Sequence, residues 1–210
     1  MKQSTKNRIL DVAEVLFTEH GFSDTSLRAI TGQANVNLAS VNYHFGSKKI
    51  LIQAVLDRYV KVLMPMLNDE FNAFRKSNEP HSIQRVFQCF VKPILALNQV
   101  RPGGATRFLI LLGRGYVESQ GHLRKFMNVH YGDVMDNLLK SIHLACPQLS
   151  PEDIFWRLHF TLGTVVFTMT SHKALLEISA ADYGQTPDLE AVITKLIPYV
   201  SSGFVAKDIN

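Results

Sequence analysis

The sequence predicts an all-α protein made of a small N-terminal unit of three short helices and a larger helical bundle. Apolar residues recur at helical spacing through nearly the whole chain of 210 residues. Turns rich in glycine and proline separate the apolar segments, and no stretch alternates apolar and polar residues as a half-buried strand does. The 46% share of hydrophobic residues indicates a large core, an extensive interface or an apolar cavity.

The N-terminal unit is expected to contain three short helices. In the first, apolar residues between Ile9 and Phe17 share one face, and Gly21 is expected to end the helix with a positive φ. Thr25 or Ser26 can cap the second helix, because a side-chain oxygen accepts a hydrogen bond from a free N–H group of the first turn. The tight turn "ANVN" follows, and its last residue, Asn37, is expected to cap the third helix.

A long helix is expected to lead into the larger bundle. It starts near Ser47 or Lys48 and can run to about Lys76, with Pro65 as the expected site of a bend. The linker "KSNEPHS" follows, and "RPGG", "CPQLSP" and "DYGQTPD" are later turns. The expected division is 1–47, 48–76 and 77–210. Within the last part, the expected helical segments are Ile83–Gln99, Ala105–Glu118, Gln120–Ala145, Pro151–Ala180 and Leu189–Val205.

The charge of the chain is weakly basic, with a formal net charge of +4. The first 60 residues contain seven Lys or Arg and five Asp or Glu. Contact with nucleic acid would therefore depend on where the cations stand rather than on bulk charge. A protein that coats DNA without sequence preference would need a stronger basic surplus.

The sequence also restricts the compartment. The N-terminal residues lack the apolar core of a signal peptide, and the most apolar later stretch, His159 to Met169, is too short to span a bilayer. Cys89 and Cys146 have no metal-ligand spacing and imply no disulfide framework. We therefore expect a soluble cytoplasmic protein with no membrane partner.

The stretch "NLASVNYHFGSKKIL" places many hydrogen-bonding side chains on one short helix. Val41 and Phe45, with Leu38 close by, form the arc expected to be buried. The opposite face is either an ordinary solvated surface or a face that enters a DNA groove. Its small residues would let the backbone approach base edges, and its polar residues could bind them. That face carries Ala39, Ser40, Asn42, Tyr43 and His44.

Each polar residue of this region has an expected role in a complex with DNA. Ser40 and Asn42 are expected to read bases, because Asn can form a bidentate pair with adenine. Tyr43 is expected to hold phosphate, as is Lys48 at the start of the next helix, where the helix dipole favours an anion. The candidate DNA contacts are Thr25, Ser26, Arg28, Asn37, Leu38, Ala39, Ser40, Asn42, Tyr43, His44, Lys48 and Lys49.

From Ile9 to about Leu56 the chain resembles the DNA-binding domain of the TetR family of bacterial transcriptional regulators. The resemblance rests on "RILDVAEVLFTEHGFSDTSLRAI" and "VNLASVNYHFGSKKIL", in which "YHF" and Lys48 match the family block Y-H-F-x-x-K. Asn35 departs from the glycine usual in the turn, but Asn also tolerates positive φ. The resemblance implies a helix-turn-helix DNA-binding domain, joined by the long helix to a helical ligand-binding and dimerisation bundle.

Further blocks resemble the PsrA-type subgroup of fatty-acid-responsive TetR regulators, namely "SQGHLRKF", "FWRLHFTLG" and the closing "DYG". This resemblance implies an apolar effector, a long-chain fatty acid or acyl-CoA, that releases the protein from a palindromic operator. It also implies a homodimer formed through the last two segments, Pro151–Ala180 and Leu189–Val205. Gly163 and Thr164 would permit close approach of paired helices.

Candidate effector contacts come from several segments of the bundle. Phe108, Leu112, Tyr116, Trp156, Phe160 and Phe167 could line an apolar pocket, although each is an equally good core residue. Ionisable groups within apolar segments need partners, and one of them could anchor a carboxylate or a CoA phosphate. A histidine there is more often a hydrogen-bonded core residue. The candidates for this anchor are Arg107, Arg114, His122, His159 and His172.

Two other functions compete with this hypothesis. An enzyme is disfavoured because GxSxG, HExxH, P-loop and zinc-site patterns are missing, and "GRG" at Gly113–Gly115 is not followed by the glycine of a dinucleotide fingerprint. We therefore expect no catalytic residue, metal or cofactor. The serious alternative is a TetR-type regulator of efflux or catabolism that senses an unrelated drug or metabolite. The favoured hypothesis is a repressor that leaves its operator when effector binds.

Overall fold

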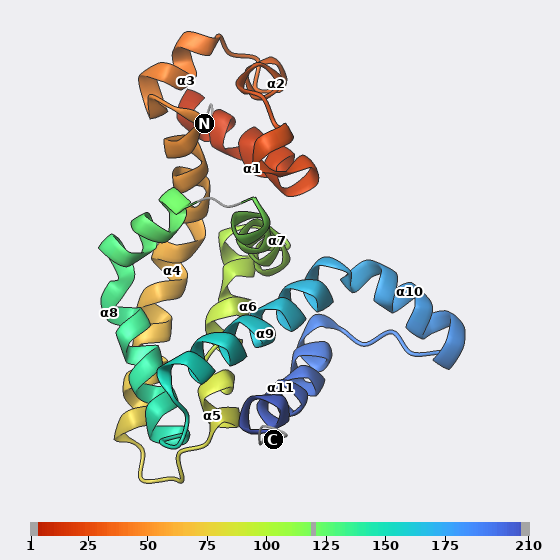
Figure 1. Ribbon diagram of the computed structural model, residues 1–210. Helices are drawn as coiled ribbons and strands as arrows, with labels where there is room; N and C mark the ends of the chain where they lie inside the picture. Colours follow the sequence, from red (N-terminus) through yellow and green to blue (C-terminus); the bar gives the residue numbers. More distant parts are fainter. Residues whose placement is uncertain (1–3, 119–120, 207–210) are drawn as a thin grey trace.

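The computed structural model of the protein describes residues 4–118 and 121–206. Every regular element within these ranges is an α-helix, which confirms the predicted all-α fold. None of these helices is both long and apolar enough to cross a membrane. In chain order, and as labelled in Figure 1, the helices are α1 (Thr5–Asp24), α2 (Leu27–Gln33), α3 (Leu38–Phe45), α4 (Lys48–Lys76), α5 (Ile83–Gln88), α6 (Val91–Val100), α7 (Gly104–Val117), α8 (Gly121–Ala145), α9 (Pro151–Thr170), α10 (His172–Tyr183) and α11 (Leu189–Val205).

Helices α1, α2 and α3 form a unit at one end of the molecule, here called the head, and the remaining helices form the body (Figure 1). Each helix of the head begins at a residue whose side-chain oxygen accepts a hydrogen bond from the first turn. Ser4 caps α1, Ser26 caps α2 and Asn37 caps α3. The expected cap at Asn37 is thus confirmed, and Ser26 rather than Thr25 caps the second helix.

Gly21 and Asn35 of the head have a positive φ, as the sequence predicted, and Gly46 at the end of α3 has one as well. Gly21 has φ 86° and ψ 173°, and after this break α1 continues for one more turn to Asp24. Asn35 has φ 49° in the turn between α2 and α3. Only glycine adopts the Gly21 conformation readily, whereas asparagine tolerates the left-handed region that Asn35 occupies.

The long helix α4 connects the head with the body. It runs from Lys48 to Lys76, the predicted range, and its backbone stays helical through Pro65, where the bend expected from the sequence stays a prediction. Its buried face contacts α1 in the head and α6, α7 and α8 in the body. Tyr59 lies on this face, with its ring 5.8 Å from that of Phe108 in α7. The buried apolar residues of head and body form one continuous core, because α4 carries apolar side chains through both.

Two segments predicted as single helices each form two separate helices in the structure. The segment Ile83–Gln99 divides into α5 and α6 at Cys89 and Phe90, just before Pro93, which has no N–H group to bond the carbonyl four residues earlier. The segment Pro151–Ala180 divides at Ser171, after a stretch in which threonine hydroxyls donate to main-chain carbonyls. Such bonds compete with the regular helix. In the segment Gln120–Ala145, Gln120 lies outside the described residues, and α8 has a break at Tyr131.

Candidate nucleic-acid interface and effector region

The face of α3 that the sequence marked as a DNA-reading surface is exposed. Val41 and Phe45 are buried beneath it, at 0% and 5% exposure, whereas the Tyr43 side chain is 85% exposed. Asn37, Ala39 and Asn42 are exposed beside Tyr43, and Ser40 is half-buried. The sequence also placed Leu38 close to this buried arc. That part of the prediction was wrong, because the Leu38 side chain is 42% exposed at the start of α3.

Ser40 and its neighbour Asn37 are held in place by the helix cap. The Asn37 side-chain oxygen accepts hydrogen bonds from both the backbone N–H and the hydroxyl of Ser40, each at 2.9 Å. The Ser40 hydroxyl proton is therefore engaged, and its oxygen is left to accept a bond from a base donor. The Asn42 side chain takes no part in this cap and is exposed one turn further along α3.

Cations and hydroxyls surround this face, but they are not equally placed for a phosphate. Ser26 and Arg28 are exposed at the start of α2, and Lys49 is exposed at the start of α4. Lys48 is half-buried, and its Nζ donates to the carbonyl of Ser23 at 3.2 Å. His44 is also half-buried, with its ring 5.0 Å from that of Tyr43.

Thr25 is the one predicted contact that the structure turns inward. Its side chain is only 2% exposed, and its hydroxyl lies within donating distance of two carbonyls, 2.7 Å from Gly21 and 3.2 Å from Leu16. The hydroxyl thus secures the last turn of α1 and does not reach a phosphate. Ser26 provides the exposed hydroxyl at this position instead.

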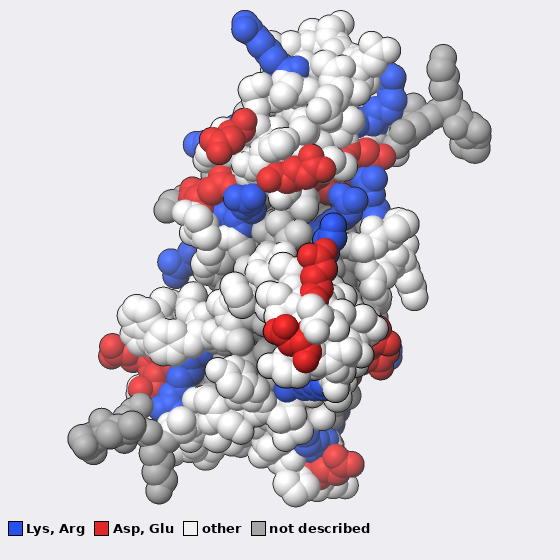
Figure 2. All heavy atoms as spheres, turned by 90° about the vertical axis from the view of Figure 1, so that its right-hand side faces the viewer, with Lys and Arg blue, Asp and Glu red and all other residues white. Residues whose placement is uncertain are grey.

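A buried ion cluster that the sequence analysis missed joins the head to the body. Glu14 of α1 is completely buried, and its Oε2 lies 3.2 Å from Arg58 of α4 and 3.3 Å from Arg101 at the end of α6. Asp11 lies 2.7 Å from the same two guanidinium groups. Glu14 could have been found from its position among apolar residues on one helix face, since a carboxylate there needs a cationic partner. Figure 2 shows charged residues of both signs gathered in a belt between the head and the body.

The pKa of Tyr59 is raised beside this cluster. Burial of the phenol is the main cause, and the negative charge of Glu14 adds to it. Both effects oppose formation of a second negative charge next to the glutamate. Tyr59 therefore remains a neutral phenol beside the ion cluster.

The predicted effector residues do not line one pocket. Phe108 of α7 is buried against α4, and Leu112, which is also on α7, is half-buried. Trp156, Phe160 and Phe167 instead lie on the outer face of α9, at 51%, 65% and 62% exposure. The side-chain periodicity was read correctly, but the described residues leave more than half of each of these three side chains exposed.

The polar effector candidates are also dispersed. Arg114 points toward the head, with its Nη2 3.4 Å from the carbonyl of Glu19. His122 lies beside the start of α4, where burial and then the charge of Lys49 lower its pKa. His159 and the 56%-exposed Tyr116 make an edge contact near the surface, with ring centroids 5.7 Å apart. Arg107 is half-buried and lies near Glu14, and His172 begins α10.

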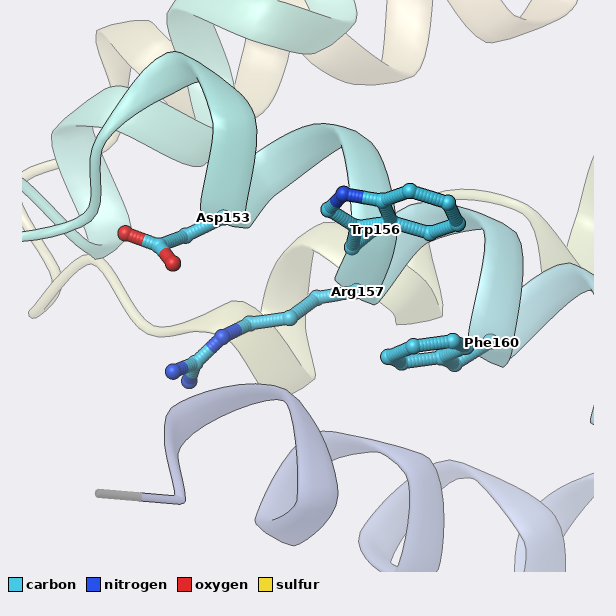
Figure 3. Close-up of a pocket in the computed structure, with 4 residues that line it drawn as sticks. All are labelled: Asp153, Trp156, Arg157 and Phe160. Atoms are coloured by element: carbon cyan, nitrogen blue, oxygen red, sulfur yellow. The ribbon is translucent and has the colours of Figure 1, made fainter. Parts of the chain in front are cut away.

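An open hollow at the start of α9 is lined by four residues that project from one side of the helix (Figure 3). Two of them are already bound within the chain, because the Asp153 carboxylate accepts hydrogen bonds from Ser150, the N-cap of α9, and Arg157 donates to the carbonyls of Phe204 and Ala206 at 2.6 and 2.8 Å. Trp156 and Phe160 are stacked, with ring centroids 6.0 Å apart. Among the described residues, no group of three His, Cys, Asp or Glu could hold a metal ion.

Both parts of the chain match known family patterns. Residues 9–55 match the pattern of the bacterial regulatory proteins of the tetR family, and residues 88–203 match the tetracyclin repressor-like C-terminal domain. The chain belongs to the TetR family. Its head corresponds to the first pattern, and more than half of its length, including α6 to α10, lies in the second.

Individual TetR-type relatives are distant. The Bacillus subtilis (strain 168) protein YttP is 34% identical over 88 residues, which are 41% of this chain and 42% of that protein. The negative transcriptional regulator IcaR of the biofilm operon icaADBC in Staphylococcus aureus (strain Newman) is 28% identical over 62% of each chain. The chain thus matches between 42% and 62% of the length of these two relatives.

The same fold occurs in solved structures of the family. PfmR, a TetR family transcriptional regulator from Thermus thermophilus, has a TM-score of 0.54 with 15% identity. The alignment covers 96% of this chain and 100% of PfmR. The arrangement of head, connecting helix and body is therefore that of a TetR-type regulator. The relatives named here are regulators rather than enzymes.

Proposed function

We propose that this protein is a transcriptional repressor that binds operator DNA as a homodimer and leaves it when an effector binds the body. The observation that carries the proposal is the exposed polar face of α3 on a head whose core is buried beneath it. In this proposal α3 enters the major groove as the recognition helix of a helix-turn-helix. Residues 1–47 form the DNA-binding domain, 48–76 connect it, and 77–210 form the effector-binding and dimerisation domain. Such a regulator works on chromosomal DNA in the cytoplasm.

The contacts divide into those that read bases and those that hold the backbone. Asn42 reads a base edge with its amide, and Ser40 accepts through its hydroxyl oxygen. Other exposed groups, chiefly Tyr43 and Lys49, bind the phosphate backbone of the DNA. These contacts fix the register of the helix in the groove. Lys48 has two further N–H donors besides the one that bonds Ser23, so it can also reach a phosphate. The remaining proposed contacts are Ser26, Arg28, Asn37, Leu38, Ala39 and His44.

The proposed dimer forms through α9 and α11. Trp156, Phe160 and Phe167 recur on the outer face of α9, and Tyr199 of α11 is 70% exposed. A fully exposed aromatic side chain offers about 150–250 Å² for burial, so these four, at 51–70% exposure, together offer roughly 370–620 Å² of the roughly 800 Å² that a stable interface needs from each partner. The exposed aromatic residues therefore supply much of the area required. A dimer also lets two recognition helices read a palindromic site, which one short helix cannot.

The proposed effector is a long-chain fatty acid or acyl-CoA. The support is the resemblance of the C-terminal blocks to the PsrA-type subgroup, together with the apolar residues on the interior side of α7. Phe108 and Leu112 lie there, between α4 and the rest of the body. An acyl chain gains about 0.8 kcal/mol for each methylene buried, so affinity should rise with chain length until the site is full. Binding that reorients α4 would move the two heads out of register with successive major grooves.

Two experiments test this function separately. Selection from genomic fragments should recover a palindromic site that the protein prefers to random DNA, and failure to enrich any sequence would contradict operator binding.

Titration of C8 to C18 acids and their CoA esters into the complex of the protein with this site should then release the protein. A coupling of about 2.7 kcal/mol, within the allosteric range, is a hundredfold change in DNA affinity. If no chain length releases lipid-free protein, the fatty-acid effector is wrong. Mass spectrometry of co-purified ligand would then identify the drug or metabolite expected by the alternative.

A further inference from the structure

Glu118, the residue that ends α7, binds the head directly. Its Oε1 accepts a hydrogen bond from the backbone N–H of Phe22 at 2.9 Å, and its Oε2 accepts one from that of Ser23 at 2.6 Å. These N–H groups follow the break at Gly21, where the interrupted helix leaves amides without carbonyl partners in the preceding turn. A carboxylate suits this place for the same reason that anions bind at helix N-termini.

The same turn of α1 is held from its other side by the connecting helix. The carbonyl of Ser23 accepts a hydrogen bond from Lys48, the first residue of α4, at 3.2 Å. Ser23 thus links α7 and α4 through its own N–H and C=O groups. Arg114, one turn before Glu118, approaches the carbonyl of Glu19 at 3.4 Å. The end of α1 therefore rests on two residues of α7 and one of α4.

Gly21 is required by this contact as well as by its own backbone. A Cβ atom at residue 21 would lie 2.5 Å from Oε1 of Glu118, closer than real Cβ contacts allow. The φ of 86° is also one that other residues rarely adopt. Glu118 can therefore approach α1 this closely only because residue 21 is a glycine.

We propose that Glu118 is a positioning residue through which the body controls the orientation of the DNA-binding head. This inference rests on the proposed DNA-binding function and adds to it the route of regulation. The helix that ends at Glu118 also carries Phe108 against α4, and its Gly113 lies close enough to Val166 of α9 that a Cβ there would be 2.6 Å from that side chain. A rearrangement of the body that moves α7 must therefore move or break the contact with Phe22 and Ser23.

The electrostatics of the contact support a charged acceptor. Burial alone would raise the pKa of Glu118, but the hydrogen bonds from Ser23 and Phe22 and the charge of Arg114 outweigh it, and the pKa is lowered. Glu118 is consequently ionised at neutral pH. Charge-assisted hydrogen bonds of this kind are short and directional, so a small shift of α7 changes their strength steeply.

Hydrogen–deuterium exchange on the full-length protein, with and without its selected DNA site, tests the proposal. The variants are Glu118→Ala, Glu118→Gln, and Asp136→Ala as a control, an exposed carboxylate on α8 outside the proposed dimer and DNA surfaces. In free protein, Glu118→Ala should speed exchange at Phe22 and Ser23. Glu118→Gln, which keeps the side-chain volume and one acceptor oxygen, should have an intermediate effect, and Asp136→Ala should have none.

The decisive readout is the long-range effect of DNA. In the unmodified protein, operator binding should slow exchange in α2 and α3 and also change exchange in α7 and α9, because coupling between sites is reciprocal. Glu118→Ala should lose the change in α7 and α9 while keeping the protection of α3 at saturating DNA. Its operator affinity should fall about fivefold or more, the lower end of allosteric coupling.

The outcomes separate this proposal from the proposed function. Unchanged exchange at Phe22 and Ser23 in Glu118→Ala, or a retained effect of DNA on α7 and α9, overturns the role of Glu118 even if operator binding is normal. If the unmodified protein prefers no DNA sequence, DNA-binding regulation is wrong. In that case the amide exchange of Phe22 and Ser23 in free protein still tests the contact: faster exchange in Glu118→Ala than in the unmodified protein means that Glu118 holds the head.

Discussion

Arg58 of α4 and Glu14 of α1 form an ion pair with 3.2 Å between Nη1 and Oε2, and the glutamate is completely buried. Arg101, at the end of α6, binds the same oxygen at 3.3 Å. Three helices that are far apart in the sequence thus meet at one carboxylate. The cluster fixes where the head sits on the connecting helix, and Glu118 fixes the other end of α1.

Removing the buried carboxylate should strongly destabilise the fold. In Glu14→Ala the guanidinium groups of Arg58 and Arg101 lose a buried partner, and breaking such a pair costs roughly 3–5 kcal/mol. Urea unfolding, with the free energy compared to the unmodified protein, measures this cost. Asp136→Ala, at an exposed position on α8, should change it by less than about 0.5 kcal/mol. Equal effects of the two substitutions would show that the cluster does not hold the head.

The outer face of α9 should be required for the dimer. Phe160 is 65% exposed in the single chain, and Phe160→Asp would place a charge in the centre of the proposed interface. Sedimentation velocity should show a dimer for the unmodified protein and a monomer for this variant. Val129→Asp on α8, a site 69% exposed and on another helix, should remain dimeric. A dimer that survives Phe160→Asp would place the interface elsewhere.

Stability should depend on the protonation of His122. Burial, followed by the charge of Lys49, lowers the pKa of this histidine below its ordinary value of 6.5. The folded state then binds fewer protons than the unfolded state, so the contribution of neutral His122 is fully present above that value and is lost as the pH falls below it. Urea unfolding at about pH 7.5 and about pH 5.5 should show a larger loss of stability for the unmodified protein than for His122→Gln. Identical pH dependence would contradict a buried neutral His122.

Lys48 should contribute to DNA affinity without contributing to sequence preference. Lys48→Ala should weaken binding to all sequences alike and reduce the salt slope by about one for each phosphate that the variant no longer neutralises in each subunit. The measurement is the affinity for the selected site and for random DNA over a range of salt concentrations. Lys173→Ala, an exposed lysine on α10, serves as the matched control. A change confined to the selected site would mean that Lys48 reads sequence rather than phosphate.

The helical fold and the head could be predicted because their signals are local. The caps at Ser26 and Asn37 and the positive φ of Gly21 and Asn35 follow from residue types that few other residues can replace. The interruption at Ser171 was missed because it depends on several weak competitors of the helix rather than on one strong breaker.

The polar links between head and body could not be predicted from such local signals. Glu118 acts on Phe22 and Ser23, almost a hundred residues earlier in the chain, and the spacing of residues in one helix carries no information about such a partner. The exposed Trp156 and Phe160 have the periodicity of a core face, and only the three-dimensional structure separates residues that pack in the core from residues that stay exposed.

The most direct test of DNA reading by α3 is the discrimination of Asn42→Ala between its selected site and a scrambled duplex of equal length. Fluorescence anisotropy at fixed salt measures both affinities for the unmodified protein and the variant. Loss of the bidentate amide should cost roughly 1–3 kcal/mol on the selected site, about a 5- to 150-fold loss, and leave the scrambled duplex nearly unchanged. The same ratio of affinities in both proteins would contradict our assignment of α3 as the base-reading helix.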